Sequence, residues 1–158
     1  SSDLLLTKRK STPRFNYDLT ISAILEIVTS IEDELQASAP VGVCIPGSIC
    51  PATGLIQNAN STWLNDQKFQ DDLETALKRP LRLENDANCF ALSESVDGAG
   101  KGAKSVFGVI MGTGVGGGIV IDGKLHSGRT NIGGEWGHHT LHRNGVRGRP
   151  RPTAPRER

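Results

Sequence analysis

Hydrophobic and polar positions alternate between helical and strand spacing over the first hundred residues. After Asp18, apolar side chains recur every three or four positions, which predicts an amphipathic helix that ends before Pro40. A nearly continuous apolar run over 41–45 predicts a strand buried on both faces of a parallel sheet. Helical spacing returns over 67–78, and a second strand and a third helix follow from residue 81. This order predicts an α/β fold.

Glycine content separates a second part of the chain from the first. Sixteen of the nineteen glycines lie between residues 98 and 148. Apolar runs over 105–111 and 119–121 predict two strands, joined by a glycine turn over 112–118. We place the boundary between the two parts at about residues 98–104.

Three shorter features complete the pattern. Leu4–Thr7 has the composition of a short strand, and Asp122-Gly123 predicts a hairpin turn into Lys124-Leu125. Residues 143–158 are rich in Arg and Pro without apolar periodicity, so we expect a disordered tail. The chain contains no apolar run of 18 residues, and we therefore expect no membrane span.

Charge and cysteine content narrow the classes of function. Residues 1–142 carry 12 Lys and Arg against 16 Asp and Glu, a net charge of −4, whereas residues 143–158 carry 6 Arg against 1 Glu, a net charge of +5. The acidic body offers no electrostatic reason to bind nucleic acid. Three cysteines without a Cys-x-x-Cys spacing make a disulfide framework improbable and favour a cytoplasmic protein.

Asp86 lies where a predicted strand ends and a helix begins. A carboxylate at that place feels the positive end of the helix dipole and accepts hydrogen bonds readily. It suits a general base that faces a ligand hydroxyl beyond the strand ends of an α/β sheet. The alternative is that Asp86 caps its own helix, which is the commonest use of Asp at such a site. The residues around Asp86 leave both interpretations open.

Two glycine-rich stretches carry further candidate chemistry. In the turn over 112–118, backbone N–H groups and the Thr113 hydroxyl suit an anion such as a phosphate, although a flexible or bulged hairpin fits equally well. Glu135 and His138 lie three residues apart among glycines and suit sugar hydroxyls, a single metal ligand, or an ordinary polar loop. Without nearby cysteines, four-coordinate zinc cannot be completed within this second stretch.

Three motifs occur in one order along the chain. Pro46-Gly47 follows one strand, Asn85-Asp86 follows the next, and a Gly-Thr-Gly turn at Gly112 precedes the Glu135-x-x-His138 pair. Together they resemble the ROK family of sugar kinases and repressors over about residues 4–142. The segments that look most similar to the bacterial fructokinases (mannofructokinases) of that family are 42–48, 58–65, 84–89 and 133–138.

The resemblance implies an actin-like (ribonuclease H-like) ATPase and sugar kinase fold with a hexose between two lobes. Residues 1–100 would form most of the sugar-binding lobe, and residues 101–142 would begin the nucleotide-binding lobe. The implied reaction is ATP-dependent phosphorylation of fructose to fructose 6-phosphate, with Mg²⁺ and the family's zinc. Family members are homodimers, and neither a nucleic acid nor a membrane is an expected partner.

The resemblance also implies roles for individual residues. Asp86 would be the base that takes the proton of the attacked sugar hydroxyl. His138 matches the family's histidine zinc ligand. The residues that would contact sugar hydroxyls are Gly47, Ser48, Asn60, Asn85, Glu135 and His138. The residues that would line the phosphates of ATP are Gly112, Thr113, Gly114 and Gly116.

Some family elements are missing from the sequence. The chain lacks the opening strand with its Gly-Gly-Thr phosphate turn, and residues 143–158 stand where the family has a cysteine-rich zinc loop. A shifted reading frame or a truncation explains this tail better than an Arg-rich binding segment does. We therefore expect weak sugar binding and little or no kinase activity from this chain. The alternatives are an N-acetylglucosamine kinase and a sugar-sensing repressor fragment of the same family.

Overall fold

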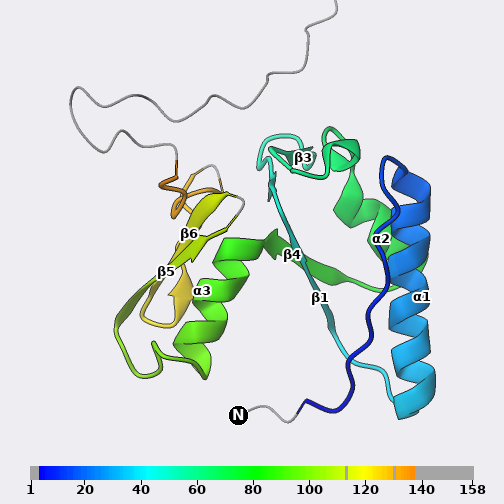
Figure 1. Ribbon diagram of the computed structural model, residues 1–158, viewed down its shortest axis with the longest axis horizontal. Helices are drawn as coiled ribbons and strands as arrows, with labels where there is room; N and C mark the ends of the chain where they lie inside the picture. The colour runs from blue at the N-terminus through cyan, green and yellow to red at the C-terminus, as the bar shows by residue number, and fades with distance from the viewer. Residues whose placement is uncertain (1–3, 113, 130, 138–158) are drawn as a thin grey trace, which may run out of the picture.

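The computed structural model describes residues 4–112, 114–129 and 131–137, which form two sets of packed elements joined where β4 continues into α3 (Figure 1). The helices are α1 (Tyr17–Leu35), α2 (Phe69–Leu77), α3 (Asp86–Val96) and the short 3-10 helix η1 (Thr62–Leu64). The strands are β1 (Val41–Ile45), β2 (Ser48–Ile49), β3 (Ile56–Gln57), β4 (Leu81–Asn85), β5 (Ser105–Met111), β6 (Val115–Ile121) and β7 (Lys124–Leu125). The predicted α/β order of helices and strands is confirmed.

Strands β1 and β4 run parallel, so their carboxyl ends meet at one edge. Val41 pairs with Leu81 at one end of the ladder, and Ile45 pairs with Asn85 at the other. The chain leaves β1 into the Pro46-Gly47 turn and leaves β4 directly into α3. The two candidate motifs therefore lie side by side, as expected for the strand ends of an α/β sheet.

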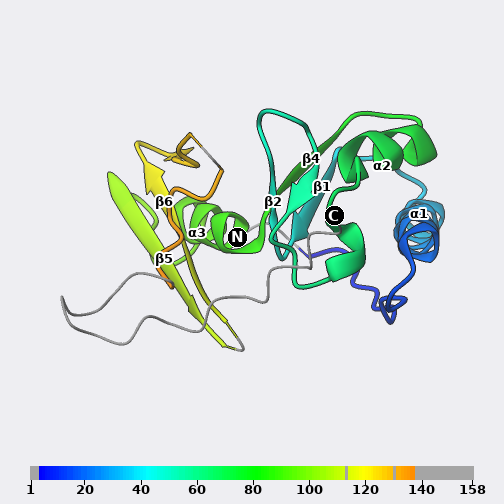
Figure 2. The same cartoon turned by 90° about the horizontal axis from the view of Figure 1, so that it is seen from above.

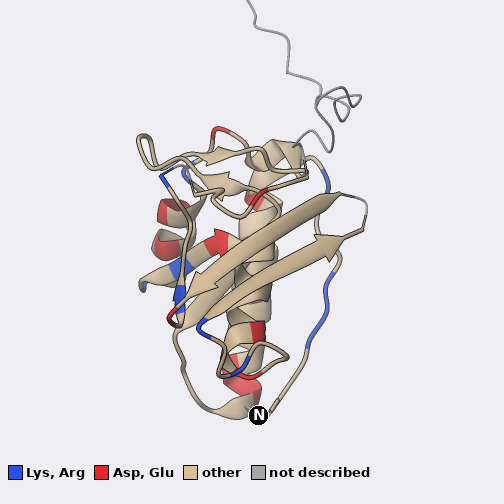
Figure 3. Ribbon diagram, turned by 90° about the vertical axis from the view of Figure 1, so that its left-hand side faces the viewer, with Lys and Arg blue, Asp and Glu red and all other residues tan. Residues whose placement is uncertain are grey.

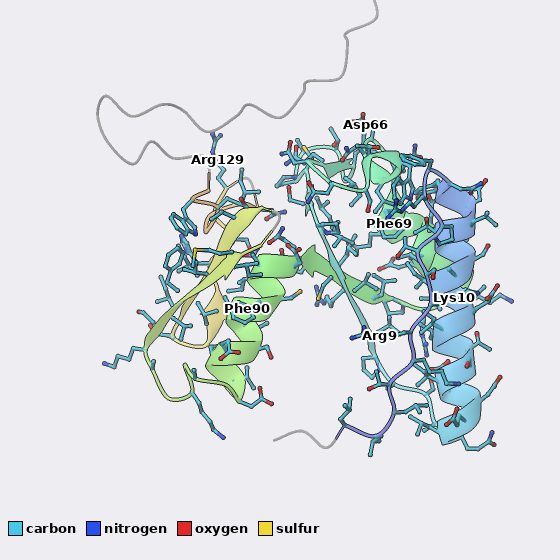
Figure 4. The ribbon with its side chains drawn as sticks, viewed as in Figure 1. Arg9, Lys10, Asp66, Phe69, Phe90 and Arg129 are labelled. Atoms are coloured by element: carbon cyan, nitrogen blue, oxygen red, sulfur yellow. The ribbon has the colours of Figure 1, made fainter. Side chains whose placement is uncertain are left out.

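Helices α1 and α2 cover one face of this small sheet (Figure 2). The predicted inward residues Phe69 and Leu73 of α2 are fully buried, and Phe69 points toward α1, where its ring lies 5.9 Å from that of Tyr17 (Figure 4). The opposite face differs from the prediction for β1, because Gly42 and Cys44 are exposed. The core residues are Ile45, Ile56, Ala59, Leu64, Phe69, Leu73, Leu81 and Leu83.

Helix α3 packs on the antiparallel β5–β6–β7 sheet, and glycines allow it to approach closely. A Cβ atom on Gly118 would lie 2.7 Å from the carbonyl oxygen of Ala87 and 2.8 Å from the Cβ of Ala91. A Cβ on Gly108 would lie equally close to Ala91. Because side chains at these strand positions would collide with the helix, glycine is required for the packing. Residues 98–104 connect α3 to β5, and the division into lobes stays a prediction.

Two strand predictions need correction. Leu4–Thr7 is not a strand: Leu4 is 83% exposed, and the segment runs beside α1, where Lys8 donates to the Ser30 carbonyl and pairs with Glu34 at 2.9 Å. Lys8 and Lys10, which follow this segment, form ion pairs with Glu34 and Glu26 of α1 and hold the chain beside the helix. The second glycine-region strand is also longer than predicted, because Val115 already pairs with Met111.

The glycine turn is consequently confined to residues 112–114, and Gly116, Gly117 and Gly118 belong to β6. The predicted hairpin at Asp122-Gly123 is confirmed, with φ of 49° and 72°, the left-handed values that a tight β-hairpin requires. The ribbon of β5 and β6 carries no charged residue along its strands (Figure 3). Within the described residues, each helix is too short or too polar to cross a bilayer.

Candidate active site

Asn85 caps α3. From the sequence alone, Asp86 could have been either this cap or a general base. The Asn85 side-chain oxygen accepts hydrogen bonds from the backbone N–H groups of Ala87, at 2.9 Å, and Asn88, at 3.2 Å. Asp86 is the first helical residue and is exposed, with Oδ1 accepting from the Ala87 N–H at 2.9 Å. Asn85 is thus the main cap, and the Asp86 carboxylate, which shares the Ala87 N–H with it, is exposed to solvent beside the helix N-terminus.

The buried side chain of Asn85 also ties this junction to the neighbouring strand end. Its amide nitrogen donates to the carbonyl oxygen of Gly47 at 3.0 Å, across a separation of 38 residues. Gly47 itself is buried, and a Cβ there would lie 2.9 Å from the Cα of Ala59 and from the carbonyl oxygen of Gln57. Asn85 therefore sets the position of Asp86 relative to the Gly47 turn.

The predicted sugar-contacting residues of the first part lie around the same turn. Ser48 is 2% exposed, and its hydroxyl accepts from the Gln57 amide at 3.3 Å. The exposed Asn60 donates its backbone N–H to the Pro46 carbonyl at 3.0 Å, which brings its loop to the end of β1. The structure thus gathers Gly47, Ser48 and Asn60 near the Asn85-Asp86 junction.

Glu135 reaches the same junction from the second part of the chain. A Cβ on Gly116 would lie 3.2 Å from Oε1 of Glu135 and 3.5 Å from the Cβ of Ala87, the residue that follows Asp86. The indole of Trp136 donates to the Gly116 carbonyl at 3.1 Å and so fixes the Glu135 segment on β6. Glu135 therefore lies near the first turn of α3, the helix that begins with Asp86.

The predicted phosphate-binding residues occupy different parts of the β5–β6 hairpin. Gly112 and Gly114 form its exposed tip, where the Gly112 N–H donates to the Gly114 carbonyl at 2.9 Å, and an added Cβ would meet nothing within 4 Å at either glycine. Gly116 lies in β6, beside Glu135. Thr113 and His138 lie outside the described residues, as does the predicted tail of residues 143–158.

Two cysteines, Cys44 and Cys89, lie beside the Asn85-Asp86 junction and hydrogen-bond to each other. Burial is the largest cause that raises the pKa of Cys89 to about 12, followed by a hydrogen bond with Cys44 and the charges of Glu84 and Asp86. The thiol of Cys89 is therefore protonated at neutral pH. Among residues 4–112, 114–129 and 131–137, no group of three His, Cys, Asp or Glu could hold a metal ion. The zinc prediction, which depends on His138, falls outside the described chain.

Two asparagines that support the site were not predicted. Asn65 accepts from the Ala59 N–H at 2.9 Å and donates to the Ala59 carbonyl at 3.3 Å, which holds the loop that carries Asn60. Asn131 donates to the carbonyl of Ile49 at 3.0 Å. Asn65 lies in a motif that the sequence analysis singled out, whereas the role of Asn131 depends on a partner 82 residues away.

The chain belongs to the ROK family, whose model matches residues 1–150. It is 41% identical over 141 residues to an N-acetyl-D-glucosamine kinase from Pasteurella multocida, a match that covers 89% of this chain and 46% of the relative. A ROK hexokinase from Thermus thermophilus matches with a TM-score of 0.73 at 35% identity, covering 82% of this chain and 44% of that one. A ROK glucokinase from Streptomyces griseus, solved with glucose and AMPPNP, matches with a TM-score of 0.72 at 30% identity, covering 85% and 43%.

These matches confirm the predicted ROK sugar kinase fold and correct the predicted sugar. The chain spans less than half the length of the curated relatives it matches, and those relatives, at 38–41% identity, are N-acetyl-D-glucosamine kinases. The fructokinase assignment is therefore wrong. It relied on the segments 42–48, 58–65, 84–89 and 133–138. In the second of these, Trp63 donates to Thr20 at 3.0 Å and Asn65 accepts from the Ala59 N–H at 2.9 Å, so both side chains hold the fold together.

Proposed function

We propose that this chain takes part in the ATP-dependent phosphorylation of an N-acetylated hexosamine, with N-acetylglucosamine as the preferred sugar. The observation that carries the proposal is the exposed carboxylate of Asp86 at the first position of α3, left available because Asn85 caps the helix. The names of the curated relatives support the choice of sugar.

In the proposed reaction Asp86 accepts the proton of the attacking sugar hydroxyl while the hydroxyl oxygen bonds to the terminal phosphorus of ATP and the bond from that phosphorus to the ADP oxygen breaks. The helix dipole favours a negative charge at this position before the proton arrives. General-base catalysis of this kind contributes roughly 10²–10⁴-fold to a rate. Mg²⁺ bound with the nucleotide would supply charge neutralisation for the phosphates.

The remaining site residues take positioning roles in this proposal. Sugar hydroxyls are held from one side by the Gly47 turn and from the other by the Glu135 loop. The β5–β6 tip faces the phosphates in this proposal, since its glycines permit the close approach that an anion needs. The residues proposed to contact sugar are Gly47, Ser48, Asn60, Asn85, Glu135 and His138, and those proposed to face the phosphates are Gly112, Thr113, Gly114 and Gly116.

Sugar binding is measured by the fluorescence of Trp136, which adjoins Glu135, in a Trp63→Phe background that removes the other tryptophan. N-acetylglucosamine, glucose and fructose are titrated separately. We expect N-acetylglucosamine to bind most tightly. Equal or tighter binding of fructose would rule out the proposed sugar, and a flat titration with all three sugars would rule out a sugar-binding site.

Because little activity is expected from this chain, phosphoryl transfer is followed as ADP release at high protein concentration with each sugar, and the product is identified by mass spectrometry. Asp86→Asn should lower the rate by about 10²-fold or more and leave the Kd for the sugar within about threefold, because the amide keeps the shape but cannot take the proton. Asp122→Asn, an equally exposed acid in the β6–β7 turn, is the matched control and should change neither quantity. An Asp86→Asn protein with the wild-type rate would refute the assignment of the base.

A further inference from the structure

The hydrogen bond from Asn131 to Ile49 links the two parts of the chain beside the proposed sugar site. The Asn131 side-chain nitrogen donates to the Ile49 carbonyl oxygen at 3.0 Å, and the Asn131 side is half-buried. Ile49 ends β2, the strand that begins with the buried Ser48. Asn131 thus contacts the strand that carries one proposed sugar ligand.

The loop that carries Asn131 is held by its own backbone and ends on the other proposed ligand. The His126 N–H donates to the Ile119 carbonyl at 2.8 Å, and the Gly133 N–H donates to the Ser127 carbonyl at 2.8 Å. At the end of this loop, the Glu135 N–H donates to the Ile132 carbonyl at 3.0 Å. A movement of Asn131 would therefore be transmitted to Glu135.

The identity of residue 131 suits both its backbone and its partner. Its φ of 58° is left-handed, a conformation that Asn adopts far more readily than most residues. Its amide supplies the N–H donor that a strand carbonyl requires, which an Asp of the same shape would not. Arg129, two residues earlier, is exposed and extends outward from the end of the β5–β6–β7 sheet (Figure 4), whereas the Asn131 side chain donates to β2.

We propose that Asn131 is a positioning residue that closes the sugar site, holding the Glu135 loop against the β2 strand of Ser48. This inference rests on the proposed function, because it assigns the closure of the same site. The anchor of the base is separate, since Asp86 is positioned through Asn85 and Gly47. Loss of the Asn131 hydrogen bond should therefore weaken sugar binding without impairing proton transfer.

The test uses the full chain with Asn131→Gly, which keeps the left-handed backbone and removes the amide. We expect the Kd and KM for N-acetylglucosamine to rise about two- to tenfold, the range that one lost hydrogen bond gives, with kcat changed less than about twofold. Asn131→Asp should raise both further, because its carboxylate would face the Ile49 carbonyl. Asp122→Gly, also at a left-handed position but in the β6–β7 turn, is the matched control and should leave all three unchanged.

Hydrogen–deuterium exchange separates this inference from the proposed function. In sugar-free protein, Asn131→Gly should speed exchange at the amides of Gly133 and Glu135 about two- to tenfold, while the amides of α1 stay as in the wild type. Unchanged exchange, or an unchanged Kd in a protein that binds sugar, would overturn the role of Asn131. A wild-type chain that binds no sugar would overturn the proposed function instead, and with it the closure, even if exchange at the loop increases.

Discussion

Replacing Asn85 by Ala tests whether this side chain holds the catalytic junction together. The change removes the α3 cap, because two helical N–H groups lose their acceptor. It also removes the donor to the carbonyl of the buried Gly47. One substitution therefore disrupts both the start of the helix and its connection to the neighbouring strand end.

The two losses have different magnitudes. A lost N-cap costs about 0.5–2 kcal/mol, and a buried carbonyl left without its donor costs about 1–3 kcal/mol. Since the groups adjoin, we expect a combined loss of about 2–4 kcal/mol in the free energy of unfolding. In a chain of this size that corresponds to a fall of about 5–15 °C in Tm.

Urea unfolding followed by circular dichroism measures this loss, and two variants divide it. Asn16→Ala removes the cap of α1, whose side-chain oxygen accepts from the Leu19 N–H at 2.9 Å, and should cost only about 0.5–2 kcal/mol. Asn85→Ser keeps a capping oxygen but is too short to donate to the Gly47 carbonyl, and should fall between the other two. The reasoning is refuted if Asn85→Ala costs no more than Asn16→Ala.

Two further predictions concern glycine packing and thiol reactivity. Gly118→Ala should lower the free energy of unfolding by about 1–3 kcal/mol, because its Cβ would lie within 3 Å of the α3 backbone. Gly112→Ala is the control: its Cβ would meet nothing within 4 Å, so the change should be neutral or slightly stabilising. Both are measured by urea titration, and equal effects would contradict the packing argument. At pH 8 iodoacetamide should label Cys50 faster than Cys89, because a hydrogen bond with the Thr53 side chain is the largest cause that lowers the pKa of Cys50, whereas burial raises the pKa of Cys89. Peptide mass spectrometry measures both labelling rates, and faster labelling of Cys89 would be the contrary result.

Local sequence was sufficient to predict those structural features that depend on neighbouring residues. The helix after Asp18, the 105–111 strand and the Asp122-Gly123 turn were predicted from periodicity and turn chemistry, because each is stabilised by contacts within a few positions. The Asn85-Asp86 pair was recognised as a junction for the same reason. The strand predicted over Leu4–Thr7 was wrong, because a strand forms only where another strand pairs with it, and this segment lies beside α1 instead.

Tertiary structure decided how the junction is used. The sequence by itself determined that an Asn and an Asp stand between a strand and a helix, but not which of them caps α3. That choice follows from the Asn85 amide, which reaches Gly47 across 38 residues and leaves Asp86 exposed. Asn131 depends in the same way on Ile49, 82 residues away. Hydrogen bonds between such distant residues exist only after the chain has folded, so no local spacing could have predicted them.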